Sequence, residues 1–466
     1  MASINKKSAK PVVTTHEGAK TVSVNALEQL KRTVMTCMLW EDSFYENGIS
    51  VHDRIVDLVS KVSAKQAFDV AVAARNESKL RHVPLLIART MAKLDTHKHL
   101  VADLLEEIIQ RPDELTEFLA IYWKDKKQPL SAQVKKGLAR AFAKFNEYSI
   151  AKYNRDGAIK LRDVLFLVHA KPKDGIKGFT KTARKSGINC PEDTGSQLFK
   201  KLVDGTLETP DTWEVELSAN GNNKESWERL LSEKKLGAFA LIRNLRNMLK
   251  VNVSATMIKE ALKAANVSKI IPYRFIAAAR YAPNLEPQLE EAMFKTIVDK
   301  PKLPGKTLLL VDVSGSMNIS ISAKSDLTRL DAACGLAMLA RELCEDIEIY
   351  SFSDYDMLVA TRRGFALRDA INNSQRHGGT RLGYSVLNIH NKTKYDRMIV
   401  ISDEQSSDRP PNMPKGKRYI INVAAYQNGV GYDSGWTHIN GWSEAVLDYI
   451  NVSEKIMEDT DASKKE

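Results

Sequence analysis

The chain has 466 residues, a hydrophobic share of 43% and a formal net charge of +11. Single hydrophobic cores stop growing at roughly 250–300 residues, so the length predicts two or more domains. The sequence predicts no membrane span and no signal peptide, and its four scattered cysteines predict neither a disulfide framework nor a zinc site. We therefore expect a cytoplasmic protein.

The positive charge belongs to the first 300 residues. Residues 301–466 hold 20 Lys and Arg against 22 Asp and Glu, whereas residues 1–300 hold 49 against 36. A basic excess confined to one segment favours a polyanionic partner for that segment. The alternative is a generally basic, solvated surface.

Residues 1–20 are polar and predict a flexible arm, whereas residues 21–300 predict helices almost throughout. Apolar residues recur three and four apart in this stretch, and prolines fall mainly between the apolar segments. This spacing indicates short helices in pairs. The helix density favours an array of HEAT-like repeats, although without a clean sequence period an irregular helical domain remains the alternative.

A cationic segment lies between residues 123 and 172. Its candidate RNA-binding cations are Lys135, Lys136, Arg140, Lys152, Arg155, Lys160 and Arg162. Helical spacing places Lys136, Arg140 and Lys144, here called the cationic strip, on one face. Such a strip would neutralise the phosphates of RNA or DNA with a strong salt dependence. A plain solvated face is the alternative.

Two further arginines, Arg243 and Arg246, lie three apart in the stretch IRNLRNM. They are candidates for RNA binding, and they could equally bridge to acidic residues of neighbouring helices. The same two alternatives hold for Arg81 and His82.

Short apolar strands alternate with helical patterns between residues 301 and 452, and residues 453–466 predict a charged, frayed tail. The predicted strands cover 307–313, 347–352, 398–402 and 419–423. Continuously apolar strands that alternate with helices predict a mostly parallel, Rossmann-like sheet covered on both faces. Ligands of such sheets bind beyond the carboxyl ends of the strands.

The first of these strands leads into Asp312-Val-Ser314-Gly-Ser316. Thr380 follows a Gly-Gly turn after the second strand, and Asp403 closes the third strand. Carboxylate and hydroxyl oxygens are hard ligands that suit Mg²⁺ best, with Mn²⁺ or Ca²⁺ as possible substitutes. The alternative is a serine-rich turn whose hydroxyls only cap a helix.

This pattern resembles the metal-ion-dependent adhesion site of the von Willebrand factor A family. The resemblance implies that Ser314, Ser316 and Thr380 bind the cation directly or through water, with Asp312 and Asp403 close by. No nucleophile or general base is positioned beside these residues, so the pattern predicts a docking site and not an enzyme. A phosphatase-type loop would need a second aspartate where Ser314 stands.

Several helical segments resemble the TROVE module of the Ro autoantigen family. They are LRHVPLLIA, KKGLARAFAKFNEYSIAKYNR, KLRDVLFLVHAKP, LGAFALIRNLRNML and IPYRFIAAARYA. The resemblance implies a ring of HEAT-like repeats closed by the A-type domain. It also implies Y-like noncoding RNA bound outside the ring, and single-stranded 3′ ends of misfolded or precursor RNA bound in its hole.

By the same resemblance Lys152 and His169 match positions tied to Y RNA binding, whereas Asp156 stands where an arginine would be expected. A 3′-to-5′ exoribonuclease is a possible partner, and a monomer apart from RNA is expected. A metal-dependent protein-adhesion scaffold is the main alternative function, although the basic first 300 residues argue against it. Nuclease activity would need an acidic cluster that the helical part lacks.

Overall fold

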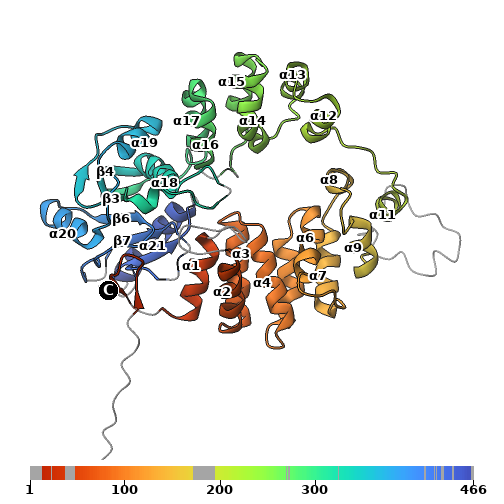
Figure 1. Ribbon diagram of the computed structural model, residues 1–466, viewed down its shortest axis with the longest axis horizontal. Coiled ribbons are helices and arrows are strands. Elements are labelled where there is room, and N and C mark those ends of the chain that lie inside the picture. The colour runs from red at the N-terminus through yellow and green to blue at the C-terminus, as the bar shows by residue number, and fades with distance from the viewer. Residues whose placement is uncertain are drawn as a thin grey trace, which may run out of the picture. The chain divides into compact units, whose positions relative to one another are not determined.

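A computed structural model describes residues 13–21, 24–36, 48–171, 195–268, 270, 273–323, 325–413, 416–424, 426, 428–431, 435–442 and 445–462 (Figure 1). The chain forms two compact units. The helical unit comprises residues 53–226, and the α/β unit comprises residues 1–52 together with 227–466. The helical stretch predicted as one module at 21–300 is thus divided between two units.

The helical unit is built from short helices that pack in pairs. Their bounds are α2 (Gly48–Ser60, shared with the other unit), α3 (Ala64–Asn76), α4 (His82–Lys93), η1 (Lys98–Leu100), α5 (Val101–Ile108), α6 (Pro112–Tyr122), α7 (Ala132–Phe142), α8 (Glu147–Tyr153), α9 (Leu161–Val168), α11 (Gly195–Asp204) and α12 (Trp213–Asn220). Helix α3 packs on α4, and α5 packs on α7. This arrangement confirms the expected helical repeats.

Local sequence signals explain where these helices begin and how closely they pack. The side chains of Ser63 and Ser131 accept hydrogen bonds from backbone N–H groups in the first turns of α3 and α7. Helix α7 approaches α5 closely at Gly137, where a Cβ atom would lie 2.8 Å from the carbonyl oxygen of Ala102. Only glycine fits such an approach, so this position fixes the α5–α7 pair.

The α/β unit combines an N-terminal hairpin, further helices and a sheet. Its elements are β1 (Val13–Thr14), β2 (Lys20–Thr21), α1 (Ala26–Thr36), α13 (Lys224–Ser232), α14 (Ala238–Lys250), α15 (Ala255–Ala264), α16 (Tyr273–Tyr281), η2 (Pro283–Leu285), α17 (Glu286–Phe294), β3 (Leu303–Asp312), η3 (Gly315–Asn318), α18 (Arg329–Leu343), β4 (Cys344–Phe352), β5 (Asp356–Leu358), α19 (Gly364–Asn372), α20 (Leu382–Lys392), β6 (Arg397–Ser402), β7 (Arg418–Asn422), β8 (Thr437–Asn440) and α21 (Ala445–Ala462). None of the described helices is long and apolar enough to cross a membrane.

The six-stranded sheet has the order β5-β4-β3-β6-β7-β8, and only the pairing of β5 with β4 is antiparallel. Leu308 and Leu310 of β3 form a core with residues of α20 on one face. The alternate residues point to the other face, and α18 also contacts β3. The four predicted strands are therefore confirmed as a mostly parallel sheet, whereas β5 and β8 were not predicted.

The N-terminal segment differs from the expected flexible arm. Residues 13–21 form a hairpin that is hydrogen bonded to the loop after β6. The Thr15 hydroxyl donates to the carbonyl of Ser406 at 2.8 Å, and the His16 backbone N–H donates to Oε1 of Gln405 at 2.8 Å. These partners lie almost 400 positions away in the chain, so the polar composition of the segment could not reveal them.

Candidate metal and nucleic-acid sites

The carboxyl ends of β3 and β6 bring most of the predicted metal ligands together. The Ser316 hydroxyl donates to Oδ2 of Asp403 at 2.7 Å, and the Ser314 and Ser316 hydroxyl oxygens lie 3.3 Å apart. Asp312 accepts hydrogen bonds from the Ser402 hydroxyl at 2.6 Å and from the Ser314 backbone N–H at 2.9 Å. Adjacent parallel strands thus place two carboxylates and two hydroxyls at one sheet edge.

Thr380 lies at the same edge, and it is buried. The backbone N–H of Gly315 donates to the carbonyl of Gly378 at 3.0 Å, which joins the turn before Thr380 to the metal loop. The carbonyl of Thr380 accepts a hydrogen bond from the Ser406 hydroxyl at 3.0 Å. The structure therefore fixes the backbone of Thr380 beside the site.

The two carboxylates are buried close to each other. Asp312 and Asp403 are both fully inaccessible to solvent. Burial, together with the charge of Asp403, raises the pKa of Asp312 to about 7. Two buried acidic groups with hydroxyls between them form a hard-oxygen donor set that fits a small divalent cation. The described residues contain no group of three or more His, Cys, Asp or Glu side chains for a metal, so hydroxyls would have to complete any coordination shell here.

A buried ion-pair network lies directly behind Asp403. Glu404 has a positive φ of 58° and is fully buried, which is an unusual conformation for a residue other than glycine. Its carboxylate pairs with Arg32 of α1 and lies 2.6 Å from Nε2 of His438. Although burial opposes ionisation, His438 and Arg32 lower the pKa of Glu404 to about 2. This network anchors the loop that carries Asp403, and the sequence did not predict it.

The second candidate site is a groove between α14, α16 and the loop before α18, here called the arginine groove. Its volume is about 560 Å³. The side chains that give it its character are Arg243, Arg246, Arg274, Arg280, Phe239 and Tyr281. Two of its arginines lie over aromatic rings, with 4.9 Å between the Arg246 guanidinium and the Tyr281 ring centroid and 5.7 Å between Arg274 and Phe239.

The chemistry of the arginine groove suits single-stranded nucleic acid. Phe239 is 50% exposed and Tyr281 is 43% exposed, so both rings offer apolar faces to a ligand. Exposed aromatic rings stack on bases, and arginines pair with phosphates. The structure thus brings together the predicted Arg243 and Arg246. It adds Arg274, which lies in the TROVE-like segment IPYRFIAAARYA and was not itself predicted to bind RNA.

The arginine groove and the metal site are connected through α18 and the described residues before it. Arg280 donates two hydrogen bonds to the Asp331 carboxylate at 2.5 and 2.6 Å, and the Tyr281 hydroxyl donates to Asp326 at 3.0 Å. The buried Arg329 donates to the carbonyl of Ser316 at 2.7 Å. Hydrogen bonds thus connect the groove residues Arg280 and Tyr281 to α18 and the loop before it, and Arg329 of the same helix to the metal loop.

The cationic strip of the helical unit is largely engaged in contacts within the protein. Arg140 donates to Asp103 of α5 at 2.7 Å and lies 3.4 Å from Glu106. Lys144 donates to backbone carbonyls at the end of α5, including that of Ile109 at 2.6 Å. The neighbouring Lys136 is exposed. Acidic residues more than 30 positions earlier thus occupy part of the predicted strip.

The other predicted cations are distributed over α7, α8, the loop after it and α9. Lys135 is half-buried on α7, and Lys160 pairs with the exposed Asp156 at 2.6 Å. Arg155 and Arg162 are exposed. The ion pair of Lys160 with Asp156 is a surface contact, and such contacts contribute little to stability.

The two residues carried over from the Ro resemblance lie on different helices of the helical unit. Lys152 is in α8, with its ammonium 5.8 Å from the Tyr153 ring centroid. His169 caps the C-terminus of α9 with a φ of 52° and is exposed. The left-handed backbone at His169 is costly for a residue with a Cβ atom, so a merely structural cap would favour glycine.

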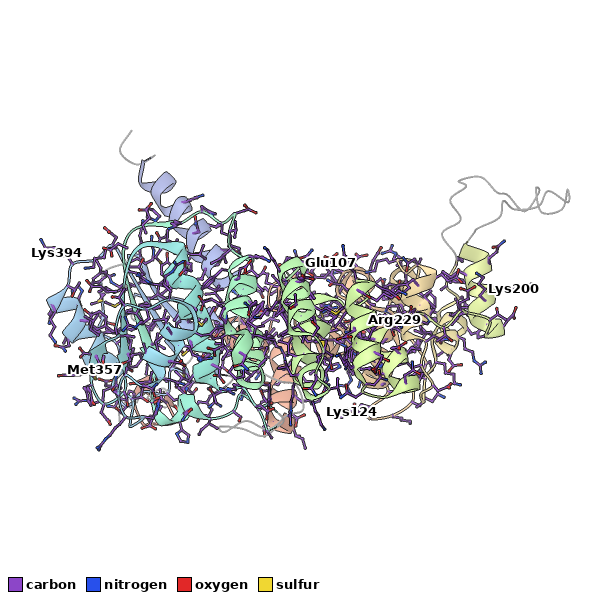
Figure 2. All side chains as sticks on the ribbon, turned by 90° about the horizontal axis from the view of Figure 1, so that it is seen from above. Glu107, Lys124, Lys200, Arg229, Met357 and Lys394 are labelled. Atoms are coloured by element: carbon purple, nitrogen blue, oxygen red, sulfur yellow. The ribbon has the colours of Figure 1, made fainter. Side chains whose placement is uncertain are left out.

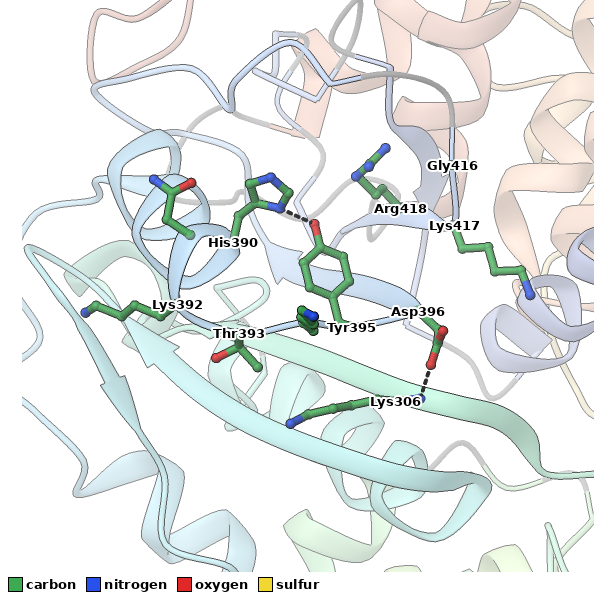
Figure 3. A pocket seen from close by; sticks show the side chains of 11 residues that line it. Lys306, His390, Lys392, Thr393, Tyr395, Asp396, Gly416, Lys417 and Arg418 are labelled. Atoms are coloured by element: carbon green, nitrogen blue, oxygen red, sulfur yellow. Dashed lines mark hydrogen bonds between the residues drawn. The ribbon is translucent and has the colours of Figure 1, made fainter.

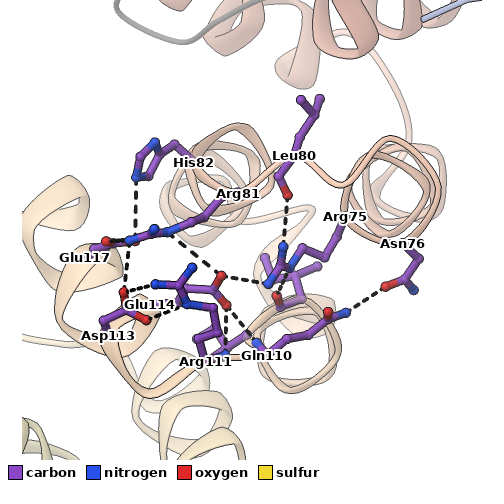
Figure 4. A network of polar contacts seen from close by, with 12 residues as sticks. Arg75, Asn76, Leu80, Arg81, His82, Gln110, Arg111, Asp113, Glu114 and Glu117 are labelled. Carbon is purple, nitrogen blue, oxygen red and sulfur yellow. Dashed lines mark hydrogen bonds and ion pairs between the residues drawn. The ribbon is translucent and has the colours of Figure 1, made fainter. Parts of the chain in front are cut away.

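Arg81 and His82 belong to a polar network between consecutive helix pairs (Figure 4). Arg81 donates to Glu117 at 2.8 Å and to Asp113 at 3.1 Å. Glu114, which is almost fully buried, accepts from Arg75 at 2.7 Å and from the backbone N–H of Arg111 at 3.1 Å, among other donors. Arg81 therefore bridges to acidic residues of a neighbouring helix, which is the alternative to RNA binding given above.

Comparisons with known proteins match one segment of the chain by sequence and almost the whole chain by fold. The model of the TROVE domain matches residues 205–334. "Telomerase protein component 1" of Rattus norvegicus and that of Mus musculus are each 38% identical over 89 residues, which is 18% of this chain and 3% of each relative. The crystal structure of the Deinococcus radiodurans RO (RSR) protein matches 91% of this chain and 98% of its own, with a TM-score of 0.57 and 17% identity.

The TROVE match covers the arginine groove and the metal loop but not the helical unit before residue 205. Lys152 and His169 therefore lie outside the matched range. The likeness to the solved structure extends the fold over almost the whole chain.

Proposed function

We propose that the chain is a Ro-type TROVE protein that binds RNA without catalysing a reaction and holds single-stranded 3′ ends of misfolded or precursor RNA. The arginine groove carries this proposal. Its aromatic rings lie beside guanidinium groups, as at Arg246 and Tyr281, and this arrangement accepts unpaired bases with their phosphates regardless of sequence.

Basic side chains of the helical unit, of which Arg155 and His169 are exposed and Lys152 is half-buried, support a second contact with structured RNA of the Y type. Lys152, Arg155 and His169 would serve this contact by resemblance to the Ro family. A charge reversal at Lys152 and His169 should weaken binding of a structured small RNA while single-stranded RNA still binds. Unchanged binding of both would remove this site assignment but leave the arginine groove.

We further propose that Asp312, Ser314, Ser316, Thr380 and Asp403 hold a divalent cation, most simply Mg²⁺. The cation would neutralise the two buried carboxylates and leave a coordination position for a partner's carboxylate. An exoribonuclease that receives the RNA end is a candidate for this partner. The alternative of a protein-adhesion scaffold without RNA would be favoured if the purified chain bound proteins through this site and no RNA.

The test is the affinity of the purified full chain for two RNAs with the same stem, one blunt and one with a single-stranded 3′ tail. The proposal predicts tighter binding of the tailed RNA and a linear fall of log affinity with log salt, with a slope of about −0.7 for each single-strand phosphate contact. Equal and salt-independent affinities for both RNAs would reject it.

A further inference from the structure

A basic pocket lies at the amino-terminal end of the parallel strands, at the opposite end of the sheet from the metal site. Its volume is about 890 Å³. Lys306 of β3, Tyr395 of the loop before β6 and Arg418 of β7 come to it from three segments of the chain (Figure 3). Ligands of parallel sheets usually bind at the other edge, so the fold alone gives no reason for a pocket here.

The charge of this pocket contrasts with that of its domain. Residues 301–466 carry slightly more acidic than basic side chains. Five residues that line the pocket are nevertheless Lys or Arg, and one is acidic: Lys306, Lys392, Lys394, Lys417, Arg418 and Asp396. The carboxylate of Asp396 accepts a hydrogen bond from the Lys306 backbone N–H at 2.7 Å. The acidic group is thus used to hold the backbone, and the cations define the pocket.

Nearby acidic residues pair with three of the lysines. Lys306 pairs with Glu348, Lys417 lies 3.1 Å from Glu454, and Lys392 lies 4.0 Å from Asp356. The Lys392 side chain is 62% exposed and lies 4.0 Å from the largely buried Asp356, and a pair of an exposed lysine at this distance contributes little to stability. The flexible side chain of Lys392 can therefore leave Asp356 and bind a phosphate instead.

Lys394 is the most available cation of the pocket. It is exposed, and it has no ion pair among those the structure gives for the described residues. Figure 2 shows it projecting from the edge of the α/β unit. Nearby, the Tyr395 hydroxyl lies 2.7 Å from Nδ1 of His390. Hydroxyl, imidazole and ammonium groups together offer several donors to a phosphate oxygen.

We propose that this pocket binds phosphate groups of the RNA backbone. It would give the α/β unit a second RNA contact, separate from the arginine groove. This inference rests on the RNA-binding function proposed above. The favoured ligand is a polyanion because consecutive phosphates add their interactions with the separate cations of the pocket and release counterions, which a single small anion does not.

The test compares Lys392→Gln/Lys394→Gln with Lys61→Gln/Lys65→Gln in the full chain. Both variants remove two exposed lysines, and the second pair lies on the helical unit, where Lys61 and Lys65 are 57% and 72% exposed. The pocket variant should weaken binding of the tailed RNA about three- to tenfold at moderate salt and reduce the salt slope by about one to two. The control variant should change both much less.

A footprint on the wild-type chain gives an independent readout. RNA should protect Lys394 from an amine-acetylating reagent, measured by peptide mass spectrometry, while Lys65 stays reactive. Equal losses in both variants, or an unprotected Lys394, would overturn the proposal. Protection by millimolar inorganic phosphate but not by RNA would also overturn it and assign the pocket to a small anion. A wild-type chain with no salt-dependent RNA affinity would instead reject the RNA-binding function itself.

Discussion

Arginine has different roles in the two units of this protein. In the helical unit, Arg140 and Arg81 donate to acidic residues of neighbouring helices and hold these helices together. In the α/β unit, Arg246 and Arg274 lie over aromatic rings along a groove. A cation in the sequence therefore predicts a nucleic-acid contact only when its acidic neighbours in space are known.

The largest expected effect tests how strongly the α/β unit depends on its buried ion pair. Replacing Arg32 with alanine leaves Glu404 charged and without its fully buried partner. The free energy of unfolding should fall by roughly 3–5 kcal/mol, measured by urea denaturation. Lys65→Ala, which removes an exposed pair of the helical unit, should change it by less than about 0.5 kcal/mol. Equal effects would erase the contrast between buried and exposed pairs.

The acid sensitivity of the same network should be of similar size. The pKa of Glu404 is about 2 in the folded state against an ordinary value of 4.5 for a glutamate. Because the folded pKa is depressed, the stabilisation is complete above pH 4.5 and is lost as the pH falls towards 2, with an order of magnitude of 3 kcal/mol. Denaturation of Glu404→Gln between pH 6 and 2.5 should show a flatter decline than the wild type. Parallel curves would contradict this assignment.

Addition of a metal should stabilise the α/β unit by a smaller amount. A ligand that binds only the folded state contributes about 2.7 kcal/mol at one hundred times its dissociation constant. Mg²⁺ should therefore raise the melting temperature of the wild type, and chelation should reverse the rise. Asp312→Asn should melt at the same temperature with and without Mg²⁺. A rise that persists in this variant would place the cation elsewhere.

The smallest effect concerns His169 in the helical unit. Its left-handed backbone at φ 52° favours glycine. His169→Gly should therefore raise stability by about 0.5–1 kcal/mol, measured by denaturation, while structured RNA binds less tightly. Higher stability with unchanged RNA affinity would show that the residue is only a helix cap.

The positions of the candidate metal ligands could be predicted from sequence because the signal was local. Asp312, Ser314 and Ser316 follow one apolar strand, and strand order then brings Asp403 to the same edge. The Arg32–Glu404 pair joins residues 372 positions apart, and no local pattern marks either of them. The ion pair of Arg140 with Asp103 and the position of the Tyr281 ring beside Arg246 likewise depend on packing between helices. The spacing of residues along one helix does not encode this packing.

The most direct test of the account compares Arg243→Gln/Arg246→Gln with Lys136→Gln/Arg140→Gln for binding to a single-stranded RNA oligonucleotide. Each variant removes two positive charges. The groove variant should bind roughly tenfold more weakly or worse, because it removes two guanidinium groups that can pair with phosphates, one of them beside the Tyr281 ring. The strip variant should lose less than about twofold. A larger loss in the strip variant would contradict the assignment of single-stranded RNA to the arginine groove.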